Sequence, residues 1–424
     1  MISINDIRSK PKKIEEALKS KGYDGSIKDI ISLDENFRRV THSLEKLRAK
    51  KNIVSEQVAL AKRSGEDSEN QIKEMRSLGD ELKSLELSSK DLKIKLSSRL
   101  EEIPNVPDDS VPIGLDEKDN VIIREWGNKP VFNFKEKSHV ELAKLLNLLD
   151  FERGAKISGS GFPLYIGKGA ELERRIINSM IEHHVNDYNF IEMFPPVLMT
   201  EESMRTTGQL PKFKEDMYFT ELDQLYLAPT AEVPITNVHR NEIISESELP
   251  IEYVAYSPCF RRESGSYGKD TRGLLRLHQF NKVEMVKFVK PVDSYKALEE
   301  ITLQAESILQ KLGIAYRVVE LCTGDLSFAA AKCYDLEIWS PGEKKWLEVS
   351  SCSNFEDFQA RRGKIRYRSE GDGKVDFLHT LNGSGLATPR LFVSLVETYQ
   401  NLSGKIDLPD ILTKYIERQR INSE

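Results

Sequence analysis

The stretch YSPCFRRESGSYGKDTRGLLRLHQFNKVEM, Tyr256–Met285, holds parts of two β-rich runs and decides the fold class. In a strand, residues of equal parity share one face, so Arg261 and Glu263 project together, as do Phe280 and Glu284. Phe280 and Glu284 lie about 13 Å apart at roughly 3.3 Å per residue, near the span of a nucleotide carrying a small group. The ring could hold a base and the carboxylate an amine. Spacing alone equally fits a surface ion pair between Arg261 and Glu263 and a core role for Phe280.

The surrounding sequence favours an antiparallel α+β domain. Short β-rich runs such as IEYVAYSPCFRRE, YDLEIW and KWLEVSS alternate with helical stretches. The sequence has no βαβ alternation and no G-x-x-x-x-G-K-[ST] loop, so a nucleotide site must be built differently. Upstream, the proline-rich stretch IPNVPDDSVPIG (Ile103–Gly114) is typical of a linker. We therefore expect two domains, residues 1–105 and 106–424.

Residues before this linker carry apolar side chains at heptad spacing. The series runs from Leu33 to Ala61 and again from Ile72 to Ile103. The polar stretch RSGEDSEN joins two helical segments of about 30 residues, each roughly 45 Å long, which predicts an antiparallel hairpin over about 34–102. An oligomerisation coiled coil is the simplest interpretation. Basic side chains among acidic ones could instead meet phosphates: Lys46, Arg48, Lys50, Lys51, Lys62 and Arg63.

Composition narrows the class of protein without naming its function. The opening residues MISINDIRSKPKK do not form a signal peptide, and no run of about 18 apolar residues occurs, so we expect a cytosolic protein. A net charge of −6 gives no sign of nucleic-acid binding. The four cysteines and seven histidines lack zinc-ligand spacing, so we expect reduced thiols and no zinc.

Several segments carry a resemblance to one family. Tyr256–Met285 closely resembles the second signature of the class II aminoacyl-tRNA synthetases, in its seryl form. Further segments resemble the same family in the expected order: TGQLPKF (Thr207–Phe213), APTAE (Ala228–Glu232), LEVSSCSNFEDFQARR (Leu347–Arg362) and NGSGLATPR (Asn382–Arg390). The resemblance covers nearly the whole chain, including the hairpin and the linker.

The first signature of the class, a helix followed by a strand that ends in proline, fits another part of the chain. Ala170–Asp187 would be the helix, and FIEMFPPVL, with Pro195 and Pro196, the strand. These elements form the dimer interface in the family, so the resemblance implies a homodimer. Relatives commonly have glycine where Asn189 stands, but asparagine tolerates positive φ, so the turn should persist.

The resemblance implies ATP-dependent ligation of L-serine to tRNA(Ser). The serine carboxylate would attack the α-phosphorus of ATP, and the 3′-terminal adenosine of tRNA would then accept serine from the seryl-adenylate. Whether tRNA(Sec) is a second substrate stays open. Positioning and charge stabilisation dominate such displacements. The family's catalytic arginines correspond to Arg261 and Arg390.

The resemblance also implies an ATP site and a Mg²⁺ site. Arg261 would reach the α-phosphate, while Phe280 and Arg390 would lie on opposite faces of adenine. The implied ATP-binding residues are Arg261, Arg262, Glu263, Phe280, Glu348, Val349, Ser350, Ser351 and Arg390. Glu348 and Ser351 resemble the family's metal ligands. They differ in parity, so we expect an irregularity in their strand.

Serine recognition follows from the same resemblance. Thr230 and Glu232 would hold the substrate amine, Glu284 the amine and the hydroxyl, and Ser384 would lie beside that hydroxyl. The implied serine-binding residues are Thr230, Ala231, Glu232, Arg261, Glu284 and Ser384. A site that needs a substrate hydroxyl can reject the analogue lacking it by about 10⁴-fold.

The helical hairpin of the family binds the long variable arm of serine tRNA, through shape and backbone rather than sequence. Two other classes of function are less consistent with the sequence. A synthetase-like binding protein without ligase activity is disfavoured by Arg261, Glu348 and Arg390. An enzyme that loads an amino acid onto a carrier protein is disfavoured by the hairpin, which such an enzyme has no evident need for.

Overall fold

The computed structural model describes residues 1–65, 67–264 and 273–414, and the chain divides into two compact units. The first unit is Met1–Lys19 with Tyr23–Pro104, and the second is Ser20–Gly22 with the chain from Asn105 onward. The division falls in the proline-rich stretch that follows the second long helix, where prolines interrupt helical hydrogen bonding.

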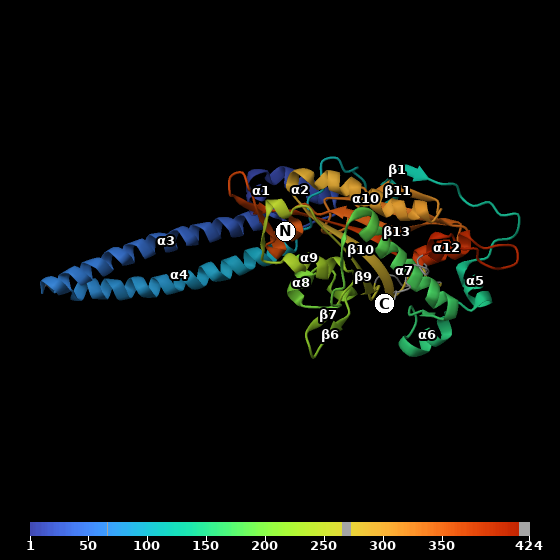
Figure 1. Cartoon of the computed structure of the whole chain (residues 1–424). Helices are drawn as coiled ribbons and strands as arrows, with labels where there is room; N and C mark the ends of the chain where they lie inside the picture. Colours follow the sequence, from blue (N-terminus) through green and yellow to red (C-terminus); the bar gives the residue numbers. More distant parts are fainter. Residues whose placement is uncertain (66, 265–272, 415–424) are drawn as a thin grey trace, which may run out of the picture. The chain divides into compact units, whose positions relative to one another are not determined.

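The first unit is helical, and two of its helices lie side by side as a long hairpin (Figure 1). Its helices are α1 (Ile4–Ser9), α2 (Pro11–Ser20), α3 (Ile27–Ser64) and α4 (Glu69–Glu101). At about 1.5 Å per residue, α3 and α4 are about 57 Å and 50 Å long. Heptad positions are buried between them, among them Leu44, Val54, Val58, Leu78 and Leu82. The predicted hairpin is confirmed.

Helix α3 begins earlier than the heptad pattern indicates. Its first turns bury Ile27, Ile30 and Asp34. Asp34 is 1% exposed, and its carboxylate pairs with Arg8 at 2.8 Å and with Arg38 at 3.0 Å. These two cations compensate the cost of burying the carboxylate. A buried position of α3 is therefore occupied by a charged residue, which a search for apolar residues at heptad spacing does not find.

An eight-stranded sheet forms the centre of the second unit (Figure 1). Its strand order is β1-β11-β12-β13-β16-β10-β9-β4, and every neighbouring pair is antiparallel except β9 with β4. The strands are β1 (Val121–Trp126), β4 (Ile191–Met193), β9 (Ile251–Phe260), β10 (Gln279–Val289), β11 (Tyr316–Glu320), β12 (Lys332–Ser340), β13 (Lys345–Asn354) and β16 (His379–Ala387). The predicted antiparallel α+β class is confirmed.

Smaller sheets flank this one, with strand orders β15-β14-β8, β5-β7-β6 and β2-β3. Their strands are β2 (Leu149–Asp150), β3 (Leu164–Tyr165), β5 (Leu198–Met199), β6 (Phe219–Thr220), β7 (Leu225–Leu227), β8 (Ile243–Ser245), β14 (Arg366–Arg368) and β15 (Val375–Phe377). The helices of the unit are α5 (His139–Leu146), α6 (Phe151–Ser158), α7 (Gly167–Tyr188), α8 (Glu201–Thr206), α9 (Glu232–Thr236), α10 (Ser294–Lys311), α11 (Phe358–Gly363), α12 (Thr388–Thr398) and α13 (Ile411–Lys414). In the parts of the chain that the structure describes, no helix combines the length and apolarity needed to cross a membrane.

One large core joins the central sheet to the helices α7, α10 and α12. Residues of all these elements are fully buried in it, for example Ile176, Met285, Ile301, Leu336 and Phe392. The cysteines Cys259, Cys322, Cys333 and Cys352 are free and buried, as predicted. This packing holds β9, β10, β13 and β16 in a fixed register.

Two backbone features expected from the sequence are present. Glu348 and Ser350 pair with successive residues of β12, so Val349 is the extra residue of a β-bulge. This is the irregularity predicted between Glu348 and Ser351. Asn189, between α7 and β4, has φ 61°, which confirms that asparagine supports the turn there.

Candidate active site

A cavity of about 750 Å³ lies in the second unit, lined by residues of β10, β13 and β16 and of the segments beside β9. Most residues predicted for ATP and serine line it: Thr230, Glu232, Arg261, Glu263, Phe280, Glu348, Val349, Ser350, Ser351, Ser384 and Arg390. Ala231, Arg262 and Glu284 are outside the lining, and Ala231 and Glu284 are fully buried. Residues 265–272, the centre of the second signature, lie outside the described residues.

One end of the cavity combines an aromatic ring with a guanidinium group. The centre of the Arg261 guanidinium lies 5.2 Å from the centroid of the Phe280 ring. Its Nε donates to the Pro229 carbonyl at 3.4 Å. The Phe280 ring packs partly against the core and also lines the cavity. The core position and the cavity position considered from the sequence are therefore both correct for this ring. Flat aromatic and guanidinium groups both suit the faces of a planar base.

Glu263 pairs with a partner that the sequence did not indicate. Its carboxylate lies 2.7 Å from the guanidinium of Arg276, and both residues line the cavity. Glu263 has φ 53°, an uncommon conformation for a residue with a side chain. Such backbone strain is concentrated at functional sites. The Glu263 carboxylate thus pairs with Arg276, a partner that was not considered from the sequence.

Arg390 connects two walls of the cavity. It lies in the first turn of α12 and donates from Nη1 to the Glu348 carbonyl at 2.6 Å and to the Glu348 carboxylate at 3.4 Å. Its Nε donates to the Leu275 carbonyl at 3.4 Å. These contacts fix the plane of the guanidinium relative to β13.

Oxygen donors gather around the bulge in β13. Asp335 lies opposite Ser351 in the β12–β13 pairing. Burial, then the negative charge of Glu348, raises the pKa of the Asp335 carboxyl well above its ordinary value, although a hydrogen bond with Ser351 lowers it. The Ser351 hydroxyl also lies 3.1 Å from the Cys333 sulfur. The two carboxyl groups and the hydroxyl form a set of hard oxygen donors, which suits Mg²⁺.

The other end of the cavity holds a buried polar network around Glu284. Its Oε2 lies 2.5 Å from the Lys282 ammonium and accepts from the Ser384 hydroxyl at 3.3 Å. Its Oε1 accepts from the Asn382 amide at 3.0 Å. Lys282, Asn382 and Ser384 line the cavity and each contacts Glu284, which lies directly behind them. The pairing shows that this place accommodates an ammonium group beside a carboxylate.

A second buried carboxylate, Glu232, continues the network. It accepts from the Gln359 amide at 2.6 Å and from the Asn382 amide at 2.9 Å, so Asn382 bridges Glu232 and Glu284. The Thr230 hydroxyl accepts the Glu232 backbone N–H at 3.2 Å. Burial, then the charge of Glu284, raises the pKa of Glu232 from 4.5 to about 7. Glu232 is therefore ready to ionise when a cation arrives.

Sequence reasoning missed four residues of the site: Lys282, Asn382, Arg276 and Gln359. Lys282 and Asn382 could have been predicted from the sequence, because each lies on the same strand face as a predicted site residue, Phe280 and Ser384 respectively. Arg276 follows residues 265–272, which lie outside the described part of the chain, and Gln359 lies in the short helix α11. No periodicity links either of them to the cavity.

The basic residues predicted for tRNA lie on the hairpin of the first unit. Lys46, Arg48, Lys50, Lys62 and Arg63 are exposed, whereas Lys51 is half-buried. Arg48 pairs with Glu86 at 2.7 Å and Lys50 with Glu74 at 2.8 Å, so both ion pairs join α3 to α4. Solvent screens exposed pairs of this kind, so their attraction is weak and a phosphate can replace the carboxylate.

Comparison with known proteins agrees with this geometry. Residues 1–107 match the model of the seryl-tRNA synthetase N-terminal domain, and residues 213–399 match the class II tRNA synthetase core domain (G, H, P, S and T). A serine–tRNA ligase of Thermodesulfovibrio yellowstonii is 49% identical over 98% of this chain and 99% of its own length. Another from Chlorobium luteolum is 50% identical over 98% of each chain.

Solved structures give the same result. Seryl-tRNA synthetase from Pyrococcus horikoshii, complexed with ATP, is 36% identical with a TM-score of 0.92 over 98% of each chain. The cytoplasmic serine–tRNA ligase of Naegleria fowleri, in complex with AMP, is 29% identical with a TM-score of 0.87 over 98% of each chain. The chain therefore belongs to the seryl-tRNA synthetase family, the class II ligases that join serine to tRNA.

Proposed function

We propose that the cavity binds ATP and serine side by side, forms seryl-adenylate, and delivers serine to the 3′-terminal adenosine of tRNA(Ser). One observation carries this assignment. The cavity joins an end with an aromatic ring and two guanidinium groups to an end where the buried Glu232 lines the wall and the buried Glu284 lies directly behind it. The first end suits a base and phosphates, and the second suits an ammonium group.

At the nucleotide end, adenine would lie between Phe280 and Arg390. Arg261 covers the Phe280 ring at 5.2 Å, so entry of a base would displace its guanidinium toward the α-phosphate. The planar fork of arginine matches phosphate oxygens in a bidentate manner. Arg261 would therefore change partners from ring to phosphate as ATP binds.

Mg²⁺ would accompany ATP, held by Glu348 and Ser351. The support is the donor set itself: a carboxylate and a hydroxyl on either side of the bulge, with the Asp335 carboxyl beside them. Burial and the negative charge of Glu348 raise the pKa of Asp335. A divalent cation would reduce the repulsion between Asp335 and Glu348. When bound, the ion neutralises charge on the phosphates.

At the serine end, the substrate ammonium would lie against Glu232 and Thr230, and the hydroxyl would lie against Glu284 and Ser384. Both carboxylates already accept the Asn382 amide, so their positions are fixed before substrate arrives. A substrate without the hydroxyl would leave buried polar groups unpaired, which costs about 1–3 kcal/mol for each group.

The chemistry needs no covalent bond to the enzyme. A serine carboxylate oxygen attacks the α-phosphorus, the bond from that phosphorus to pyrophosphate breaks, and seryl-adenylate remains. Arg261 stabilises negative charge on the α-phosphate oxygens. In the second step, a hydroxyl of the terminal adenosine attacks the seryl carbonyl carbon and AMP leaves.

The active form would be a cytosolic homodimer in which α7 and β4 form the interface. Near β4, Ile191 is 58% exposed and Phe194 is 82% exposed, which is apolar surface that a second subunit would cover. Each hairpin would hold the variable arm of a tRNA whose 3′ end lies in the partner's cavity. Sedimentation tests the dimer, and a fully active monomer at working concentration would refute it.

The decisive experiment is exchange of labelled pyrophosphate into ATP with each amino acid in turn, followed by charging of tRNA(Ser). Serine should support exchange, and alanine and threonine should support it at least about 10³-fold less well. Exchange that does not depend on serine would refute the assignment of the cavity.

A further inference from the structure

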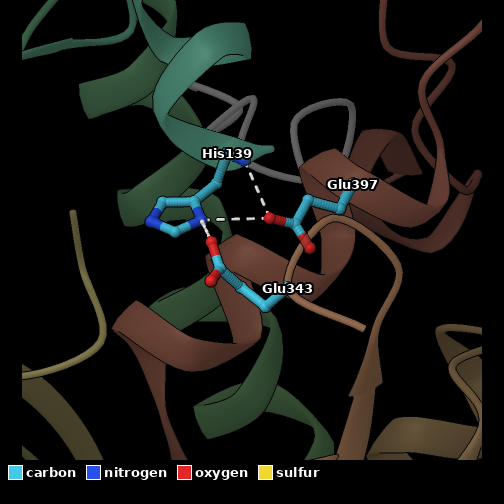
Figure 2. A group of neighbouring side chains, drawn as sticks. All are labelled: His139, Glu343 and Glu397. Atoms are coloured by element: carbon cyan, nitrogen blue, oxygen red, sulfur yellow. Dashed lines mark hydrogen bonds and ion pairs between the residues drawn. The ribbon is translucent and has the colours of Figure 1, made fainter. Parts of the chain in front are cut away.

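Outside the residues assigned to ATP and serine, a buried histidine begins helix α5. His139 is fully buried, and both its backbone N–H and its Nδ1 lie within hydrogen-bond distance of Oε1 of Glu397, at 2.8 Å and 3.0 Å. The Glu343 carboxylate lies 3.5 Å from the same Nδ1 (Figure 2). These three side chains come from α5, from the turn between β12 and β13, and from α12.

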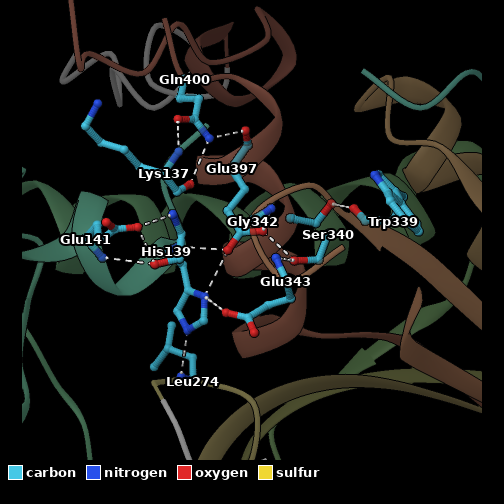
Figure 3. A network of polar contacts seen from close by, with 12 residues as sticks. Lys137, His139, Glu141, Leu274, Trp339, Ser340, Gly342, Glu343, Glu397 and Gln400 are labelled. Carbon is cyan, nitrogen blue, oxygen red and sulfur yellow. Dashed lines mark hydrogen bonds and ion pairs between the residues drawn. The ribbon is translucent and has the colours of Figure 1, made fainter. Parts of the chain in front are cut away.

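The Glu397 carboxylate is held in place by several further contacts (Figure 3). Its Oε2 accepts the Gly342 N–H at 3.0 Å and the Ser340 hydroxyl. Gln400, one turn further along the chain, exchanges two hydrogen bonds with the Lys137 backbone at 2.8 Å and 2.9 Å. The imidazole of His139 is therefore fixed from one side by three segments of the chain.

The opposite ring nitrogen of His139 accepts a backbone hydrogen bond. The Leu274 N–H points at Nε2 with a nitrogen–nitrogen distance of 3.3 Å, so Nε2 carries a lone pair (Figure 3). Nδ1 must then carry the proton, which it donates to Glu397.

This tautomer argues against a metal ion among His139, Glu343 and Glu397, although one ligand atom of each lies within 4.8 Å of the others. A cation on Nδ1 would move the proton to Nε2, facing the Leu274 N–H.

The segment that His139 holds is a wall of the cavity. Leu274, Leu275, Arg276 and Leu277 all line it. The Leu275 carbonyl accepts from Arg390, and Arg276 pairs with Glu263. Gly273, at φ +66°, lies so close that a Cβ there would be 2.0 Å from Nε2 of His139. The backbone therefore lies directly against the imidazole, and only glycine fits at this point.

We propose that His139 is a positioning residue for ATP: its Nε2 holds the backbone at Leu274, and so sets the places of Arg276 and of the carbonyl that orients Arg390. This inference rests on the proposed binding of ATP in the cavity. His139 does not touch the substrate and acts through the wall that it supports.

Two substitutions test the hydrogen bonds of the two ring nitrogens separately. In His139→Asn, the amide can replace Nδ1 as donor to Glu397 but cannot reach Leu274. In His139→Gln, the longer side chain can place an oxygen where Nε2 accepts from Leu274. Pyrophosphate exchange on the full-length enzyme should show the KM for ATP about tenfold higher in His139→Asn, with the KM for serine changed by less than about twofold. His139→Gln should recover most of the ATP affinity.

Two control variants make the result decisive. His379, which contacts the Ser294 hydroxyl at 2.9 Å outside the cavity lining, offers a matched variant: His379→Asn should leave both KM values unchanged. Phe280→Ala tests the ATP assignment itself. If Phe280→Ala raises the KM for ATP and His139→Asn does not, the role of His139 is refuted, but the assignment of the cavity to ATP stands. If neither variant raises it, the assignment of the cavity to ATP fails.

Thermal unfolding of the same preparations distinguishes positioning from general stability. Equal kinetic losses in His139→Asn and His139→Gln, tracking their melting temperatures, would show a structural role only and overturn the proposal. Equilibrium dialysis with Zn²⁺ gives a further check. Stoichiometric binding that disappears in His139→Asn would overturn the assigned tautomer, and with it the proposal.

Discussion

The hairpin and the cavity both contain lysine–glutamate pairs, but the two pairs differ in their surroundings. In the hairpin, Lys50 lies 2.8 Å from Glu74, and their side chains are 56% and 45% exposed. In the cavity, Lys282 lies 2.5 Å from Glu284, and the side chains are 8% and 0% exposed. Solvent screens the exposed pair and weakens its attraction, whereas removing one partner of a buried pair costs about 3–5 kcal/mol. Lys50 and Glu74 can therefore exchange partners, whereas the Lys282–Glu284 pair is held in place.

The strongest test of this difference removes the hairpin. Deleting about residues 36–99, with a short glycine-containing bridge, should leave pyrophosphate exchange with serine nearly unchanged. The ends of a hairpin lie close together, so the bridge need not strain the second unit. Charging of tRNA(Ser) at low tRNA concentration should fall about a hundredfold or more, because the phosphate contacts supply much of the affinity. Both activities are measured on the same preparation.

Equal charging by the truncated and the intact enzyme would contradict a tRNA-binding role and leave the hairpin as a packing element. Loss of pyrophosphate exchange would instead mean that the second unit depends on the hairpin for folding. Circular dichroism of the truncated chain distinguishes the second case from a direct effect on the cavity.

The next largest effect concerns the buried pair. Glu284→Gln should lower kcat/KM for serine by about one to two decades, because a charge-assisted hydrogen bond contributes about 1.5–3 kcal/mol. The same sheet offers a matched control: Lys287 is 1% exposed and pairs with Glu252 at 2.6 Å, and neither residue lines the cavity. Glu252→Gln should lower the melting temperature without changing serine kinetics. Unchanged serine kinetics in a folded Glu284→Gln variant would falsify the assignment.

Glu232 predicts a pH dependence. Its pKa in the fold is about 7 against an ordinary 4.5, so it keeps its proton across that interval while the unfolded chain loses it. Ionisation in the fold is therefore unfavourable, and the stability contributed by this group falls as pH rises from about 4.5 to about 7.

An ammonium substrate favours the ionised carboxylate of Glu232. The KM for serine should therefore fall as pH rises through about 7 and then level off. In Glu232→Gln the KM should be higher and nearly independent of pH over this range. A wild-type profile that is flat between pH values of about 6 and 8 would contradict a titrating Glu232 at the substrate amine.

The hairpin was predictable from sequence because its contacts are local and repeat with one period. Only its start was misplaced, at Ile27 rather than near Leu33, because buried Asp34 breaks the apolar pattern. The bulge at Val349 was predictable for a different reason. Two implied ligands of opposite parity, Glu348 and Ser351, cannot share one face of a regular strand.

The cavity was predictable only in part, because its network joins segments far apart in the chain. Gln359 meets Glu232 across 127 positions, and Asn382 meets it across 150. No pattern within one segment encodes such contacts. The same limit applies to His139, whose partners Leu274 and Glu397 come from other elements. Resemblance located most of the predicted residues in the cavity lining, while the residues that support them required the packed sheet.

The smallest expected effect returns to the exposed charges of the hairpin. Replacing Lys46, Arg48, Lys50 and Lys51 by alanine should weaken tRNA binding about tenfold and leave pyrophosphate exchange unchanged. The slope of the logarithm of affinity against the logarithm of salt concentration should become shallower by about one for each phosphate that the variant no longer neutralises. Arg48 and Lys50 each leave a carboxylate on α4, which stays hydrated because these pairs are exposed. Helix content should therefore be preserved.

Lys73 and Lys95, which are 68% and 60% exposed on α4, supply a control with alanine at two lysines outside the cluster. The control variant and the α3 variant are compared by the change in salt slope for each charge removed. If this change is equal in the two variants, the hairpin attracts tRNA through its total charge, and the cluster on α3 is not a binding surface.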